Sequence, residues 1–419
     1  MRLRLLMGLV PLSLIIAGCG AGGSASGGSP TTSVTTSVSP AATASRTGTA
    51  VTSPGAATTS TPAVSATSVQ AATVPISGHC SSPATASTAS GISGMQFTSR
   101  DRGWAVGSNS ILATTDGGAR WTVQLSGALK LTSVDFINGQ DGWAVGDAAL
   151  LATTDGGAHW SSLPEPCLTI RSAHFISPTA GFAVAGATGV VLVTVDGGRS
   201  WRELPTAPAG VQSVCYSDAR HGWLGAGGVL YRTADGGATW TALTKAVAED
   251  GAGYSAVMDV ECANDGTVWA LSSGPGAGMS QQQHVGYYGS QSGVTGLFAE
   301  QTMQAPGTGP TRESPGSDPG PFSAIDSAEA VYIDACTACG MGTAPWDLVS
   351  GSGATLTTKG NVADITSPEA ASFLSAQVGW VAGTAAEYSG TFRSQQRIMA
   401  TTNGGRTWVL QWAGPWTSS

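Results

Sequence analysis

The carboxylates with the most regular spacing in this chain belong to a recurring motif, Thr-x-Asp-Gly-Gly-x-x-Trp, which returns every 39 to 41 residues over its first four copies. A calcium loop draws several oxygen ligands from one turn, whereas each copy supplies a single carboxylate. A turn explains the same residues: the carboxylate accepts hydrogen bonds from Thr and from turn amides, Gly adopts positive φ, and Trp covers a sheet. We therefore interpret these boxes as structural. The acidic or amide positions are Asp116, Asp155, Asp196, Asp235 and Asn403, and the ring positions are Trp121, Trp160, Trp201, Trp240 and Trp408.

A second set of carboxylates, Asp135, Asp259, Glu261 and Asp326, lies on or beside the predicted innermost strands. Two carboxylates about 5 to 10 Å apart are the apparatus of most glycosidases, so this set is the candidate catalytic group. His174 occupies the same strand position as Asp135, where a lone His is more often a satisfied structural residue than a base. No serine-nucleophile elbow or phosphate loop precedes a helix. We predict that each carboxylate makes a polar contact, that no residue is catalytic, and that the protein takes no cofactor or metal.

Six cysteines remain beyond Cys19, and an even number in an exported chain favours disulfides. Cys215 and Cys262 fall on equivalent strands of consecutive repeats with opposite side-chain parity, which suits a bond between neighbours. Cys336 and Cys339 are close enough for a local bond, which leaves Cys80 with Cys167. The alternative for Cys336-Thr-Ala-Cys339 is a redox dithiol or half a zinc site, but no adjacent helix and no further ligands are evident.

The elements that position these residues follow from a second landmark, a short strand of the type Gly-Trp-Ala-Val-Gly upstream of each box. It occurs seven times, in degenerate form where the box is lost, and another apolar residue precedes each aromatic by seven positions. The landmark aromatics are Trp104, Trp143, Phe182, Trp223, Trp269, Tyr332 and Trp380, and the upstream residues are Phe97, Phe136, Phe175, Tyr216, Cys262, Ile325 and Phe373.

Short strands at even spacing with a periodic Gly and aromatic motif predict propeller blades. Each repeat reads as four strands: an apolar strand, the Gly-Trp strand, a Leu-Ala-Thr-Thr strand and one that begins at the box Trp. We predict an all-β fold, a seven-bladed β-propeller of four-stranded antiparallel blades over residues 91–413, with a tail at 414–419.

The sequence of the N-terminal region predicts that the protein is exported from the cytoplasm. Arg2 and Arg4 precede an apolar run that ends in Ile16-Ala-Gly-Cys19, the form of a lipoprotein signal peptide over residues 1–18 with Cys19 as the lipidated residue. Residues 19–90 are rich in Ser, Thr, Ala and Pro and have no capacity for a core, which predicts a disordered tether. We expect anchoring at the outer face of the cell membrane, or on the periplasmic side in a cell with two membranes.

The repeats resemble BNR or Asp-box repeats, which occur in sialidases, sortilin, xyloglucan-active hydrolases and the seven-bladed Ycf48-like family of photosystem II assembly factors. The resemblance covers about residues 91–413 and is nearest to the last family. It implies an extracytoplasmic, non-catalytic propeller that docks on a membrane-protein partner through an arginine-rich patch. The arginines of this chain are few and scattered, and the Phe/Tyr-Arg-Ile-Pro motif of sialidases does not occur.

Residues 274–322 are the least repetitive part of the repeat region and predict an insertion in which Tyr287 and Tyr288 are the candidate partner contacts. The net charge of -8 gives no basic face for nucleic acid. We predict a monomeric, membrane-anchored assembly-factor propeller that engages a protein partner. The alternative is a glycoside hydrolase of the Asp-box type or a glycan-binding surface lipoprotein.

Overall fold

Short antiparallel strands make up the part of the chain that the structure, a computed structural model, describes. The described residues are 74–75, 91–147, 149–164, 166, 168–243, 256–263, 265–273, 284–290, 293–301, 319–334, 344–350, 355–388 and 390–418. The predicted signal peptide with Cys19 and almost all of the predicted tether lie outside them. No helix in these ranges is long and apolar enough to cross a membrane.

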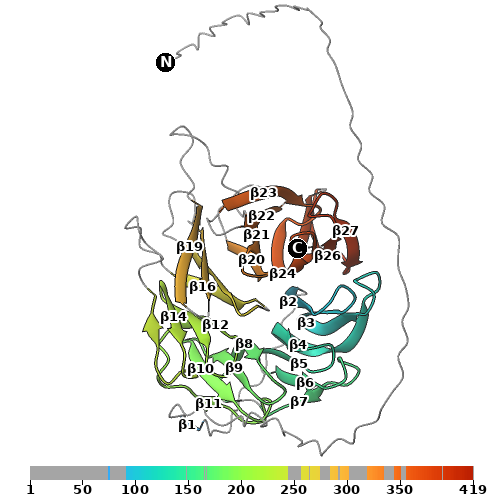
Figure 1. Ribbon diagram of the computed structural model, residues 1–419. Helices are drawn as coiled ribbons and strands as arrows, with labels where there is room; N and C mark the ends of the chain where they lie inside the picture. The colour runs from blue at the N-terminus through green and yellow to red at the C-terminus, as the bar shows by residue number, and fades with distance from the viewer. Residues whose placement is uncertain are drawn as a thin grey trace, which may run out of the picture. The chain divides into compact units, whose positions relative to one another are not determined.

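The strands of the described residues form six antiparallel sheets, and the sheets follow one another around a common centre in chain order (Figure 1). The innermost strands are β2 (Ile92–Phe97), the second half of β4 (Thr122–Phe136), β8 (Ile170–Phe175), β12 (Val211–Tyr216), β16 (Ala256–Cys262), β20 (Pro319–Ala324) and β24 (Ser367–Ser375). The Gly-Trp type strands are β3 (Gly103–Thr114), β5 (Gly142–Asp147), β9 (Gly181–Ala185), β13 (Gly222–Ala226), β17 (Val268–Ser273), β21 (Glu329–Asp334) and β25 (Val378–Tyr388).

The outer half of each sheet consists of a third and an outer strand, which flank the Asp-box where the repeat has one. Third strands are β6 (Ala149–Thr153), β10 (Val190–Thr194), β14 (Val229–Thr233), β18 (His284–Ser290), β22 (Ala344–Ser350) and β26 (Phe392–Thr401). Outer strands are β7 (Ser161–Ser162), β11 (Arg202–Glu203), β15 (Thr241–Ala242), β19 (Gly293–Gln301), β23 (Thr355–Val362) and β27 (Val409–Ala413). The sheet β2 to β7 contains two sequence repeats, because β4 pairs with β3 through its first half and with β5 through its second half.

The register explains the constant offset of seven residues. Phe97 pairs with Gly103, Phe136 with Gly142 and Phe175 with Gly181, so the upstream residue lies across from the glycine of the Gly-Trp strand. Each inner strand also carries a bulge near its start, such as the register shift between Ile170 and Ser172. Bulges increase the local twist of a strand pair, which suits sheets that fan out from a centre.

The hydrophobic core lies between consecutive sheets. Phe182 and Val184 of β9 pack with Val214, Tyr216 and neighbours of the next sheet. The same kind of packing joins the last sheet to the first, where Trp380 and Ala382 of β25 lie against residues of β2 and β3. The backbone N–H of Phe97 in β2 donates to Oγ of Ser372 in β24 over 2.9 Å, which closes the ring.

Three segments differ from the sequence prediction. Val74–Pro75 (β1), within the predicted tether, pairs with β11, an outer strand whose free edge offers unpaired backbone groups. Thr417–Ser418 (β28), within the predicted tail, pairs with β26. Residues 284–290 and 293–301, within the predicted insertion, are the third and outer strands β18 and β19 of a sheet. They lack the box between them, so the sequence pattern gave no sign of the pair.

Candidate functional site

The Asp-box is a self-contained turn. In the third box, Oγ1 of Thr194 donates to Oδ1 of Asp196 over 2.8 Å and accepts the amide of Gly198 over 2.9 Å. Oδ1 of Asp196 also accepts the amide of Ser200 over 2.8 Å, and Gly197 and Gly198 have φ of 74° and 88°. These bonds recur at Asp116, Asp155, Asp235 and Asn403. At Asp155, hydrogen bonds from His159 and Thr153 lower the pKa to about 2. The box oxygens thus face turn donors, as the sequence predicts for a structural motif.

The box Trp and the landmark aromatics form a stack that joins consecutive repeats. Phe175 stacks on Trp143 of the preceding repeat with ring centroids 3.6 Å apart, and its edge meets the box Trp201 at 6.0 Å. Nε1 of Trp143 donates to the carbonyl of the box residue Gly197 over 3.0 Å. A Cβ on Gly181 would lie 2.5 Å from the Phe175 ring, so glycine is required there. The same stack occurs at Trp380–Phe97–Trp121, Trp104–Phe136–Trp160 and Phe182–Tyr216–Trp240, and Trp408 packs partly buried near Phe373.

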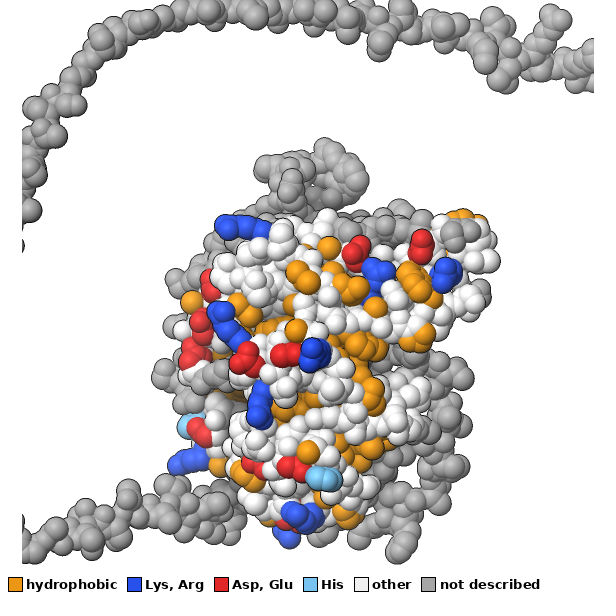
Figure 2. Space-filling view, turned by 90° about the vertical axis from the view of Figure 1, so that its right-hand side faces the viewer, with side chains coloured by type: hydrophobic (Ala, Val, Ile, Leu, Met, Phe, Trp, Pro, Cys, Tyr) orange, Lys and Arg blue, Asp and Glu red, His pale blue; other side chains and the backbone are white. Residues whose placement is uncertain are grey.

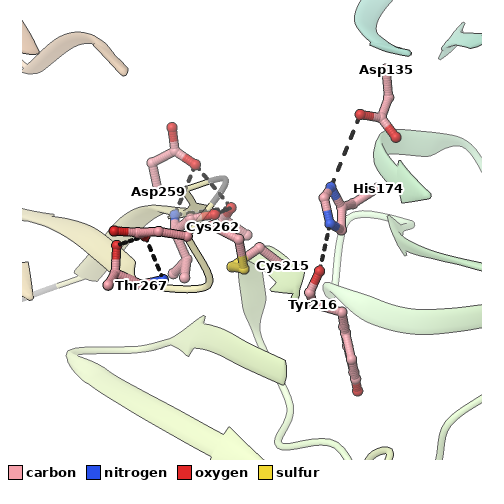
Figure 3. The surroundings of a disulfide bond; sticks show 10 residues. Asp135, His174, Cys215, Tyr216, Asp259, Cys262 and Thr267 are labelled. Carbon is pink, nitrogen blue, oxygen red and sulfur yellow. Dashed lines mark hydrogen bonds and ion pairs between the residues drawn. A yellow bond between two sulfur atoms is a disulfide. The ribbon is translucent and has the colours of Figure 1, made fainter. Parts of the chain in front are cut away.

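Three of the candidate residues, Asp135, His174 and Glu261, lie at repeat junctions, where a side chain of one inner strand bonds the main chain of the next. We call each such link a clasp. Oδ2 of Asp135 accepts the amide of Phe175 over 2.6 Å. Nε2 of His174 donates to the carbonyl of Tyr216 over 2.8 Å (Figure 3). Further hydrogen-bonded clasps join Gln96 to Phe136, Ser213 to Val260, Glu261 to Ala324, Ser323 to Phe373 and Ser372 to Phe97.

The junction between β12 and β16, where Oγ of Ser213 accepts the amide of Val260 over 3.1 Å, also carries a disulfide. Cys215 and Cys262 are bonded across β12 and β16, with Cα atoms 5.8 Å apart (Figure 3). Cys215 directly precedes the landmark residue Tyr216, as the clasp residues Asp135 and His174 precede theirs. The other predicted cysteines, Cys80, Cys167, Cys336 and Cys339, lie outside the described residues.

Burial shifts the pKa of the carboxylates on the inner strands. Burial raises the pKa of Asp135 and of Asp259, and burial together with the neighbouring Asp259 raises the pKa of Glu261 well above its usual value. Oδ1 of Asp259 accepts the hydroxyl of Ser213 over 2.9 Å. Asp326 instead caps a turn, where its Oδ1 accepts the amides of residues 328 and 329 over 2.7 and 3.0 Å. All four predicted carboxylates therefore accept hydrogen bonds that hold the fold together.

The inner strands line a central cavity of about 890 Å³. Its wall includes Asp135, Arg171, His174 and Glu369, and Nδ1 of His174 lies 4.0 Å from Oδ1 of Asp135. Oε1 of Glu369 accepts the hydroxyl of Thr384 over 2.7 Å. Among the described residues, no group of three His, Cys, Asp or Glu side chains could hold a metal ion. The channel is thus a polar space whose charged groups already bond within the protein.

Several arginines make main-chain contacts in different repeats. Arg102 donates to the carbonyl of Gly139 over 2.8 Å, and Arg171 donates to that of Val211 over 2.7 Å. On the side drawn in Figure 2, Lys and Arg side chains are interspersed with Asp and Glu side chains. No patch of one charge sign appears in this view.

Sequence reasoning found the inner carboxylates but missed their common role. A signal was present, since a polar residue or Cys215 directly precedes the landmark residue in most repeats, as Gln96 precedes Phe97. The candidate contacts Tyr287 and Tyr288 lie in strand β18, paired through Trp269 and Ala270 to β17, rather than in a loop. Their role as partner contacts stays a prediction.

Comparison with known proteins agrees with this architecture. The family model described as "Photosynthesis system II assembly factor YCF48" matches residues 83–167. No curated protein matches the chain. Among solved structures, YCF48 bound to a D1 peptide is 19% identical, with 70% of this chain and 89% of that chain covered and a TM-score of 0.47.

Two further structures are of other classes. The WD40 repeats of RRP9 are 8% identical, cover 74% of this chain and 89% of that one, and have a TM-score of 0.51. An ancestral GH74 enzyme is 13% identical, covers 79% of this chain and 55% of that one, and has a TM-score of 0.48. The sheet arrangement and the WD40 likeness identify a β-propeller. With the motifs and the family model, the chain is a BNR-repeat propeller that resembles YCF48.

Proposed function

We propose that this protein is a lipid-anchored, seven-bladed propeller outside the cytoplasm that binds a protein partner as a non-catalytic assembly factor. The observation that carries the proposal is the set of clasps. Asp135 and Glu261, two of the candidate catalytic carboxylates, each accept a main-chain amide of the next repeat at 2.6 Å. A carboxylate that holds two sheets together is poorly placed to approach a substrate, because movement would break the junction.

Two observations support seven blades. The sheet β2 to β7 spans two sequence repeats, and each of the other sheets spans one. Within the described residues, one hydrophobic cluster lies between each pair of consecutive repeats, and another lies between the last repeat and the first.

A protein is the partner class that the family model supports, since an assembly factor acts on other proteins. A disc clasped at each repeat junction suits this role, because a rigid scaffold loses little entropy when it binds. The lipid anchor rests on the sequence of residues 1–19, with its basic start, apolar run and final cysteine.

Crosslinking from intact cells tests the proposal. A tag inserted in the Ser/Thr-rich segment allows capture of the full chain from solubilised membranes, and a chain that ends at residue 90 is the matched control for anchoring without the propeller. We expect one membrane protein to be enriched with the full chain alone and to recover this protein when tagged itself. Equal capture by both chains would refute a partner-binding role for the propeller.

The anchor is tested separately by Cys19→Ala. This variant should move from the membrane fraction to the soluble fraction, with its melting temperature unchanged, because the substitution lies far in sequence from the strands. Membrane retention equal to that of the wild type would contradict lipid anchoring at Cys19.

A further inference from the structure

The hairpin formed by β25 and β26 extends beyond its counterparts in the other sheets. β25 has 11 residues, whereas β9 and β13 have 5 each. Five residue pairs, from Thr384 with Gln396 to Tyr388 with Phe392, continue the ladder beyond Gly383. At about 3.3 Å per residue, these pairs lengthen the hairpin by roughly 16 Å.

The end of the chain braces this hairpin. Strand β28 pairs with Arg393 and Ser394 of β26, and the amide of Gly414 donates to the carbonyl of Gln396 over 2.9 Å. The guanidinium of Arg393 lies 5.0 Å from the centroid of the Trp416 ring, a cation–π distance. The hairpin is therefore held as three strands rather than as an isolated pair, which is only marginally stable in water.

Two aromatic side chains lie exposed together at the tip. Tyr388 is 55% exposed and Phe392 is 57% exposed, and their ring centroids are 4.8 Å apart. Neither ring belongs to the buried core. The base of the extension bonds another sheet, since Oε1 of Gln396 accepts the amide of Ile92 over 3.1 Å. The two rings at the tip lie outside the buried core, so they are available for a contact outside the molecule.

The exposed area of the two rings favours a membrane over a protein as what they contact. With each ring a little over half exposed, the pair offers about 200 Å² of accessible area. A specific protein interface needs roughly 800 Å² on each side, whereas an interfacial membrane contact needs only a few aromatic and basic side chains. Arg393 and the exposed Glu387 pair across the ladder beside the rings, so the tip has one charge of each sign and no excess negative charge that would repel lipid headgroups.

A lipid anchor at Cys19 would allow a weak membrane contact of the tip to be populated. If Cys19 carries the lipid, 55 residues separate it from Val74, and a chain of that length spans at most about 200 Å. The propeller would then stay near the bilayer at high effective concentration, so a low intrinsic affinity is sufficient.

We infer that the tip formed by Tyr388 and Phe392 is a second membrane contact, which inserts into the headgroup region of the bilayer and orients the propeller. The inference rests on the proposed lipid anchor. The Asp-box turn after Thr401 follows the opposite end of the same strands, since Gly379 pairs with Thr401 and Tyr388 pairs with Phe392. Insertion of the tip therefore turns that end of the sheet away from the bilayer.

Hydroxyl-radical footprinting of the lipidated full-length protein tests this contact, on vesicles of phosphatidylcholine and phosphatidylglycerol. Oxidation of Tyr388 and Phe392 should fall by about threefold or more relative to Cys19→Ala protein in buffer, as rings enter the interface. Leu410, 49% exposed on the same sheet, is the internal control and should not change. Trp416, which packs on Arg393 near the tip, should also be protected on vesicles in the wild type. Tyr388→Ser/Phe392→Ser should abolish this protection and leave the melting temperature unchanged.

The outcomes separate the two proposals. If the protein floats with the vesicles and the tip is oxidised as in buffer, the membrane contact is refuted while the anchor stands. If the protein does not float, the anchor fails and the inference fails with it. Protection in native membranes but not on pure lipid vesicles would assign the tip to a protein partner and overturn the inference.

Discussion

Loss of the disulfide between Cys215 and Cys262 should destabilise the propeller measurably, because it is a covalent link across one repeat junction. The two cysteines are 47 residues apart. Closing a loop of that length in the unfolded chain corresponds to about 4 kcal/mol at 25 °C in the chain-entropy model. For a repeat region of about 320 residues, with an unfolding entropy near 2 cal/mol/K per residue, this equals a drop in melting temperature of about 6 °C.

The assay is thermal unfolding of the wild type and of Cys215→Ala/Cys262→Ala, each with and without reductant. The double variant under reductant reports any contribution of the other cysteines, which makes it the matched control. We expect the reduced wild type to melt close to the reduced variant. A fully reduced wild type that keeps its original melting temperature would refute the reasoning that this bond stabilises the junction.

Three further predictions concern packing, the boxes and charge. Gly181→Ala should lower the free energy of unfolding, measured in urea, by about 1 to 3 kcal/mol, because its Cβ meets a Phe175 ring fixed by stacking. Gly127→Ala, with open space around its Cβ, is the control and should leave the free energy of unfolding unchanged. Equal effects of the two substitutions would contradict this reasoning. Asp196→Asn should keep the melting temperature, as the natural Asn403 box suggests, and chelator should not change it; a drop on chelation would indicate bound metal. Glu261→Gln tests whether the pKa of Glu261 is raised in the folded protein. The wild type should lose stability relative to the variant as pH rises above 4.5, because the carboxyl ionises more easily in the unfolded chain than in the folded protein. A stability difference that does not change with pH would argue against a raised pKa.

The periodic parts of this fold could be predicted from the sequence because the packing repeats. Phe175 and Gly181 lie across from each other at a fixed register, so a constant offset marks every repeat. The disulfide pairing followed from the parity of Cys215 and Cys262 on equivalent strands. Each of these features involves one strand pair or one junction between repeats, so the spacing of residues in the sequence is enough to predict it.

What the sequence did not predict depends on contacts without a periodic signal. Strands β18 and β19 were assigned to an insertion because no box lies between them. The tail strand β28 depends on the unusual length of β26, which no motif announces. The common role of Asp135 and Glu261 as clasps required the spatial neighbourhood of inner strands, since each partner is 40 or more residues away.

The central claim is that the carboxylates around the channel hold sheets together and that the protein acts by binding. Its most direct test is an assay of sugar release from xyloglucan and from sialylated oligosaccharides by the wild type, Asp135→Asn and Glu261→Gln. The account predicts that none of the three releases more sugar than heat-denatured protein. Release by the wild type that is lost in either variant would contradict it.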